Sequence, residues 1–172
     1  MSLAQDAAGL LARPSRAAAA LAAAGSAGLL AGAFFFQHAM GLAPCPMCIW
    51  QRWPHAVGAA LGPALLIPAL RRLSAVPLLG LAAMAVSAGL ALLHTGVERG
   101  WWDGPSTCAG GQDAGMSTDE LLQAILEAPL VRCTDVAWEM AGLSMASWNG
   151  LASLGLLALW AAAARAGGRA RG

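Results

Sequence analysis

The residues with the clearest capacity for chemistry are two cysteines, Cys45 and Cys48, separated by Pro46 and Met47. Two thiols at this spacing can close into a small reversible disulfide, and thiolate attack on such a bond is the elementary step of thiol–disulfide exchange. Arg52 follows the second cysteine by four positions, so the two side chains share one face if the segment is helical. The segment is therefore a candidate redox site.

The sequence also indicates which of the two sulfurs is the reactive one. Pro46 suits a first helical turn, because the N–H that it lacks would have no partner there. If a helix begins at Pro46, Cys48 lies in its first turn, where the helix dipole favours an anion, and Arg52 adds a positive charge. Both effects lower the pKa of a thiol, so we expect Cys48 to be the poised thiolate.

Two more cysteines, Cys108 and Cys133, lie far along the chain. They could form a structural disulfide, a redox-active one, or a four-thiolate metal site with the first pair. All-cysteine zinc sites consist of two close pairs, so the wide separation of this second pair predicts no metal. Haem attachment is disfavoured because Ile49, and no histidine, follows Cys48. We expect Cys108 to lie in a flexible loop within reach of a partner protein, and Cys133 to be held near the bilayer.

The elements that must position these cysteines are membrane helices. Hydrophobic residues make up 58% of the 172 residues and charged residues only 11%, whereas soluble domains carry roughly 25% charged residues. About 20 apolar residues cross a bilayer. The sequence predicts an all-α polytopic membrane protein, in which a four-transmembrane-helix bundle forms one domain over 1–172. We expect the first span to stay uncleaved, and not to be a signal peptide. The predicted spans are 17–36, 53–70, 73–93 and 144–164.

The arginines predict the orientation of these spans. Most of them lie near the N-terminus, near the C-terminus or in the Arg71–Arg72 turn. The positive-inside rule therefore predicts that this turn and both termini are cytoplasmic. The cysteines then lie in the outer loops, 37–52 and 94–143. In a bacterial inner (plasma) membrane, these loops face the periplasm, where disulfides persist.

The second outer loop is predicted to contain one short amphipathic helix. Ser117 and Glu120 form a capping-box pattern ahead of an apolar face, and Pro129 limits the helix at its other end. We expect this face to lie on membrane lipid. The tryptophans beside the spans fit an interfacial belt, although a wall for an aromatic headgroup is a second interpretation.

These features together resemble the disulfide bond formation protein B (DsbB) family. The resemblance rests on the Pro-Cys-Pro-Met-Cys-Ile-Trp-Gln-Arg motif that begins at Pro44, on the Gly-Pro-Ser-Thr-Cys segment that ends at Cys108, and on the run from Cys133 to Asn149. The order of the cysteines agrees as well, since vitamin K epoxide reductase relatives place the loop pair before the C-x-x-C. The resemblance extends over 17–164.

The resemblance implies a thiol:quinone oxidoreductase that reoxidises DsbA, a periplasmic dithiol oxidase with a thioredoxin fold. By motif position, Cys108 would be attacked by the partner's thiol and would form the mixed disulfide, with Cys133 as its mate. Cys45 and Cys48 would reoxidise that pair through an interloop disulfide between Cys45 and Cys133. No nucleic acid is expected as a partner.

The resemblance also implies a quinone site. Cys48 would face ubiquinone or menaquinone, with Arg52 beside the ring, and a fixed cation there would stabilise both a thiolate and a reduced quinone oxygen. His94 resembles a family histidine near the quinone, although a hydrogen-bonded residue of the interfacial belt is an equal interpretation. Supporting roles are possible for Gln51, Glu98 and Trp53, whereas His38 and His55 are interpreted as structural.

A non-catalytic alternative stays open at this stage. A four-span membrane protein could carry two structural disulfides that only stiffen its outer face. Arg52 separates the two hypotheses, because a structural disulfide has no need of a cation beside Cys48, whereas thiolate chemistry has.

Overall fold

The computed structural model describes residues 14–67, 69, 70, 73, 75–105, 108, 117 and 131–169. Four long helices dominate this part of the chain: α2 (Pro14–His38), α3 (Pro46–Ala64), α4 (Ala75–Glu98) and α6 (Met145–Arg169). Two short strands, β1 (Glu139–Met140) and β2 (Leu143–Ser144), pair antiparallel just before α6. The described chain is thus mostly helical.

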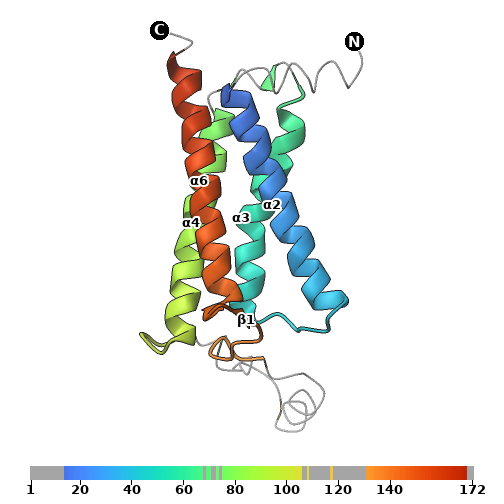
Figure 1. Ribbon diagram of the computed structural model, residues 1–172, viewed down its shortest axis with the longest axis vertical. Helices are drawn as coiled ribbons and strands as arrows, with labels where there is room; N and C mark the ends of the chain where they lie inside the picture. Colours follow the sequence, from blue (N-terminus) through green and yellow to red (C-terminus); the bar gives the residue numbers. More distant parts are fainter. Residues whose placement is uncertain are drawn as a thin grey trace.

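The helices pack as a bundle in which α2 and α4 each contact both α3 and α6 (Figure 1). Small residues allow these close approaches, as is usual between membrane helices. A Cβ atom added to Gly80 of α4 would lie 2.3 Å from the ring of Trp160 of α6, and this tryptophan is fully buried. Gly80 therefore opens the space that the largest core side chain occupies.

Three of the helices are long and apolar enough to cross a membrane: α2, α4, and the part Met145–Ala166 of α6. They contain the predicted span 17–36 and nearly all of 73–93 and 144–164. Large apolar side chains such as Phe35, Leu78 and Leu154 are exposed on them. The protein is accordingly a multi-pass membrane protein.

The second predicted span differs from the helix that is found there. α3 covers Pro46–Ala64, so it begins before residue 53 and ends before residue 70, and it is not one of the three helices that meet the criteria for a span. The sequence stays apolar past residue 64, so a hydropathy pattern does not show that the helix ends there. The one local signal is Pro68, because a proline disfavours helical backbone at the residue that precedes it. A fourth membrane span stays a prediction.

The start of α3 is as the sequence predicts. Cys45 is the N-cap, its sulfur accepts a hydrogen bond from the backbone N–H of Cys48, and Pro46 occupies the first turn. Cys48 therefore lies in that first turn, on the same face as Arg52.

A small hairpin at the entry to α6 was not predicted. Its two turn residues, Ala141 and Gly142, both have positive φ values of 53° and 74°, which suits the twist of a tight hairpin. Asn-Gly or Asp-Gly would have signalled such a turn, and alanine does not. Arg99, just after α4, donates a 2.6 Å hydrogen bond to the carbonyl oxygen of Gly142, which attaches the hairpin to α4.

Figure 1 shows that the start of α2 and the end of α6 lie at one end of the bundle. The loop that carries Cys45, the end of α4 and the hairpin lie at the opposite end. The cysteines are thus placed away from the start of α2 and the end of α6, whereas the side of the membrane that they face stays a prediction. The predicted loop helix, apart from Ser117, and the Arg71–Arg72 turn lie outside the described residues.

Candidate active site

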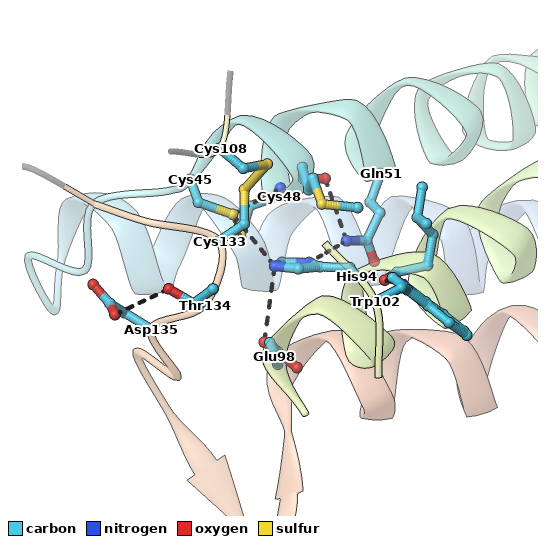
Figure 2. Close-up of a disulfide and its surroundings, with 12 residues drawn as sticks. Cys45, Cys48, Gln51, His94, Glu98, Trp102, Cys108, Cys133, Thr134 and Asp135 are labelled. Atoms are coloured by element: carbon cyan, nitrogen blue, oxygen red, sulfur yellow. Dashed lines mark hydrogen bonds and ion pairs between the residues drawn. A yellow bond between two sulfur atoms is a disulfide. The ribbon is translucent and has the colours of Figure 1, made fainter. Parts of the chain in front are cut away.

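The four cysteines gather at one end of the bundle, where they pack into one buried cluster with Met47 (Figure 2). Cys45 and Cys48 are free thiols, and the thiol of Cys45 donates a hydrogen bond to the Cys48 sulfur over 2.9 Å. Cys108 and Cys133 form a disulfide, which is the pairing that the family resemblance implies. A dithiol and a disulfide therefore lie in contact, as exchange between them requires.

The expectation that Cys108 is accessible is wrong for this state. Cys108 is only 5% exposed and Cys133 is fully buried. Cys108 packs against Val97 of α4, and Gly104 approaches it so closely that an added Cβ atom would lie 3.3 Å from the Cys108 Cβ. The turn-rich sequence around Cys108 suggested mobility, but the apolar disulfide is more stable packed on the end of the bundle than in water.

The two thiols at the start of α3 differ in their protonation. Both precede the predicted span 53–70. The hydrogen bond that Cys45 donates lowers the pKa of Cys48, whereas the same bond and then burial raise the pKa of Cys45. When the pair loses one proton, the hydrogen bond therefore favours the negative charge on Cys48 and the remaining proton on Cys45.

Arg52 contributes less to this difference than the sequence suggested. Its charge lowers the pKa of Cys48 only as the smallest of several causes, and Glu98 opposes it. The guanidinium instead donates a hydrogen bond of 2.6 Å to Gln37 of α2, and it lies 5.1 Å from the ring centre of Phe34. Arg52 is thus fixed in place beside Cys48 by the last turns of α2.

His94 is buried among the residues of the site. It is 3% exposed. Its Nε2 lies 3.5 Å from the Cys45 sulfur and 3.8 Å from a carboxylate oxygen of Glu98, and its Nδ1 lies 2.8 Å from the side-chain nitrogen of Gln51 (Figure 2). Glu98 is in turn hydrogen-bonded by the Ser144 hydroxyl.

Sequence reasoning missed a row of polar side chains that continues from Gln51 into the bundle. The side-chain nitrogen of Asn149 of α6 donates a 2.7 Å hydrogen bond to the side-chain oxygen of Gln51. The side-chain oxygen of Asn149 lies 2.8 Å from Nε2 of His55. Ser87 and Ser153 extend the row. The available signal was the cost of burying polar groups in a membrane bundle, which marks them as functional candidates.

A cavity of about 420 Å³ opens beside the dithiol, within the size range of small-molecule sites. Most of its wall is apolar and comes from α2, from α6 and from the segments that precede α3 and α6. Its polar lining consists mainly of residues already described: Cys48, Arg52, His55, His94, Glu98 and Asn149. Trp53 is 70% exposed and does not line it. The cavity therefore suits a flat apolar molecule with a few polar atoms.

Three potential ligand atoms are also close together here. The sulfurs of Cys45 and Cys48 and a ring nitrogen of His94 lie within 4.8 Å of one another. Structural zinc sites have four protein ligands, and direct hydrogen bonds between these three groups already account for their spacing. The grouping is therefore explained by dithiol chemistry, and the absence of a metal stays a prediction.

A helical membrane protein that places a dithiol against a disulfide, beside an apolar cavity, is by its site a membrane thiol–disulfide oxidoreductase. The family described as "Disulfide bond formation protein DsbB" has a sequence model that matches residues 15–163. The chain belongs to this family.

Curated relatives called Disulfide bond formation protein B agree with the assignment. The protein of Stutzerimonas stutzeri (strain A1501) is 32% identical over 153 residues, covering 79% of this chain and 87% of that protein. Those of Shewanella sp. (strain ANA-3) and Xanthomonas euvesicatoria pv. vesicatoria (strain 85-10) are 37% and 34% identical. The match to the Shewanella protein covers 75% of this chain and 75% of that protein. The match to the Xanthomonas protein covers 78% of this chain and 81% of that protein. No solved structure matches.

Proposed function

We propose that the protein is a thiol:quinone oxidoreductase of the bacterial inner membrane, which reoxidises a periplasmic DsbA-like dithiol oxidase and delivers the electrons to ubiquinone or menaquinone. One observation carries this proposal: Cys45 and Cys48 both line the apolar cavity with Arg52, and Cys45 also lies in one buried cluster with the loop disulfide. The dithiol thus stands between an electron source and a place for an acceptor.

The exchange steps follow from this arrangement. A thiolate of the partner attacks the Cys108 sulfur, and Cys133 leaves as a thiolate; the partner's second thiolate then releases Cys108 and forms the partner's disulfide. When Cys45 and Cys48 are oxidised, the Cys133 thiolate attacks Cys45, and Cys48 leaves with the electron pair. Attack of Cys108 on the Cys45–Cys133 bond restores the loop disulfide and leaves the reduced dithiol described above.

The residues around the cavity fit a quinone. A bound quinone supplies an acceptor for two electrons and two protons. The apolar walls exclude water from the Cys48 thiolate, and the Arg52 guanidinium stabilises negative charge that develops on an oxygen atom nearby. His94 and Glu98 line the same cavity, and their side chains can donate or accept a proton there.

The non-catalytic alternative has less support. It expects two structural disulfides, whereas Cys45 and Cys48 are free thiols whose sulfurs are joined by a hydrogen bond. Their unequal pKa values also serve exchange chemistry and not stiffness.

Quinone consumption tests the proposal directly. Purified protein is mixed with decylubiquinone and a reduced thioredoxin-fold partner, and quinone absorbance is followed. We expect multiple turnovers in the wild type and none with Cys48→Ala. A wild-type rate no higher than that of Cys48→Ala would contradict the proposed function.

A further inference from the structure

A continuous row of side-chain hydrogen bonds runs from the interior of the bundle to the Cys48 sulfur. It connects His55, Asn149, Gln51, His94 and Cys45, in that order, before it reaches Cys48. The members come from α3, α4 and α6. Because a hydrogen bond has a donor and an acceptor, the row has a direction, and this direction decides where protons lie.

Gln51 fixes the direction. Its amide nitrogen lies 3.2 Å from the backbone carbonyl oxygen of Met47, a group that can only accept a hydrogen bond. Its amide oxygen lies 2.7 Å from the Asn149 nitrogen, which can only donate. Exchanging the two ends of the Gln51 amide would set oxygen against oxygen and nitrogen against nitrogen. The Met47 carbonyl thus requires this orientation, and the Asn149 amide agrees with it.

The orientation of Gln51 in turn fixes the hydrogen on His94. The Gln51 amide nitrogen lies 2.8 Å from Nδ1 of His94, and because it donates, Nδ1 must accept and carry no hydrogen. The neutral ring therefore has its hydrogen on Nε2. This atom faces the Cys45 sulfur at 3.5 Å and a carboxylate oxygen of Glu98 at 3.8 Å, and the Cys133 backbone carbonyl is a further acceptor for the ring.

We propose that Gln51 is a positioning residue that keeps His94 as a hydrogen-bond donor to Cys45, so that the Cys45 thiol donates to Cys48 and the negative charge of the reduced dithiol stays on Cys48. This inference deepens the proposed quinone function, on which its catalytic meaning rests. Every bond of the row points the same way, and such chains strengthen one another.

The opposite arrangement would have the opposite effect. If Nε2 of His94 carried no hydrogen, it would accept the proton of Cys45, and the thiolate would move to the sulfur that packs on the loop disulfide. Gln51 is 6% exposed, and contacts with Met47, Asn149 and His94 hold its amide in place. The row therefore selects between two sulfurs that stand only 2.9 Å apart.

The nitrogen-15 NMR spectrum of the reduced wild type, labelled at its histidine rings, tests the central claim. We expect His94 to show a protonated Nε2 and a bare Nδ1. Assignment uses His38→Gln and His55→Gln proteins, each of which removes one of the other two histidines. A bare Nε2 on His94 in the reduced wild type would overturn the inference, whatever any variant does.

Gln51→Glu provides the matched change, because glutamate keeps the size of the side chain and removes its N–H groups. A carboxylate accepts from Nδ1, so the His94 hydrogen should appear on Nδ1. The preference of limiting iodoacetamide for Cys48 over Cys45, quantified by peptide mass spectrometry, should fall about two- to tenfold, the worth of one hydrogen bond. An unchanged preference together with an unchanged His94 spectrum would contradict the role of Gln51.

Ser153→Ala is the control, since Ser153 is fully buried and bonds to Ser87 at the far end of the row, away from the cavity. We expect it to leave the thiol preference unchanged, and an equal loss in both variants would indicate loosened packing and refute the proposal. Neither readout needs quinone or a partner. Quinone turnover with a bare Nε2 would refute this inference alone, and a protonated Nε2 without turnover would refute the proposed function alone.

Discussion

The side chain of Arg52 donates a 2.6 Å hydrogen bond to Gln37, which ties the cation beside the reactive thiol to the last turn of α2. The guanidinium lines the cavity on the same helical face as Cys48. Its position is therefore set by a neighbouring helix and not by the cysteine that it accompanies.

Replacing Arg52 by histidine should raise the apparent KM for decylubiquinone by about tenfold or more, because a hydrogen bond to a charged group contributes roughly 1.5–3 kcal/mol. Steady-state assays at saturating partner measure the effect. Gln37→Leu, which keeps the charge and removes its tether, should give a smaller rise. Quinone kinetics unaffected by Arg52→His would remove Arg52 from the site.

The reactivity of Cys48 should persist to lower pH than that of an ordinary thiol, whose pKa is about 8.5. The pKa of Cys48 is lowered in the folded protein, so its thiolate is present above this lowered value and is lost as the pH falls through it. The rate of iodoacetamide labelling against pH measures the midpoint. Cys45→Ala removes the donated hydrogen bond and should shift the midpoint to higher pH; superimposed curves would show that Cys45 does not poise Cys48.

Cys133→Ala should trap a covalent complex with an oxidised thioredoxin-fold partner through Cys108, because the free Cys108 thiolate attacks the partner's disulfide, one partner sulfur leaves as a thiolate, and no Cys133 thiol is left to break the new bond. Non-reducing gel electrophoresis after mixing with the oxidised partner, followed by peptide mapping, identifies the bond. Loss of the trapped complex in a Cys45→Ala background, with Cys108 intact, would show that the entry pair is assigned wrongly.

Gly80→Ala should destabilise the bundle by about 1–3 kcal/mol, because the new methyl group would overlap the buried Trp160 ring. Gly89→Ala, on the same helix, is the control, since nothing lies within 4 Å of its added Cβ. Thermal unfolding in detergent compares the two. Equal melting temperatures for both variants would refute the packing argument.

Local chemistry along the chain predicted the start of the site well. Pro46 and the cysteine spacing placed Cys48 in a first helical turn, and the family resemblance supplied the Cys108–Cys133 pairing. Apolar runs of membrane length predicted helices, but an apolar run does not show where helix stops within it, so the end of α3 at Ala64 was not seen.

Contacts between distant segments could not be predicted in the same way. Asn149 meets Gln51 across 98 positions of sequence, and nothing in either segment specifies which faces of α3 and α6 meet. The burial of Cys108 likewise depends on the end of the bundle on which it packs. The sequence could identify polar residues in apolar segments, whereas only the packing of the helices shows which of them are partners.

Cys45 is both a reacting atom and the cap of α3, because its sulfur accepts the Cys48 backbone N–H. A side-chain cap contributes about 0.5–2 kcal/mol to the start of a helix, and a bond from this sulfur to Cys48 or Cys133 changes its direction and its lone pairs. We therefore expect oxidation of Cys45 to loosen the first turn of α3, and reduction to re-form it. Amide hydrogen exchange at Cys48 should consequently be faster when Cys45 is oxidised than when it is reduced, so the start of the helix reports the oxidation state of the protein.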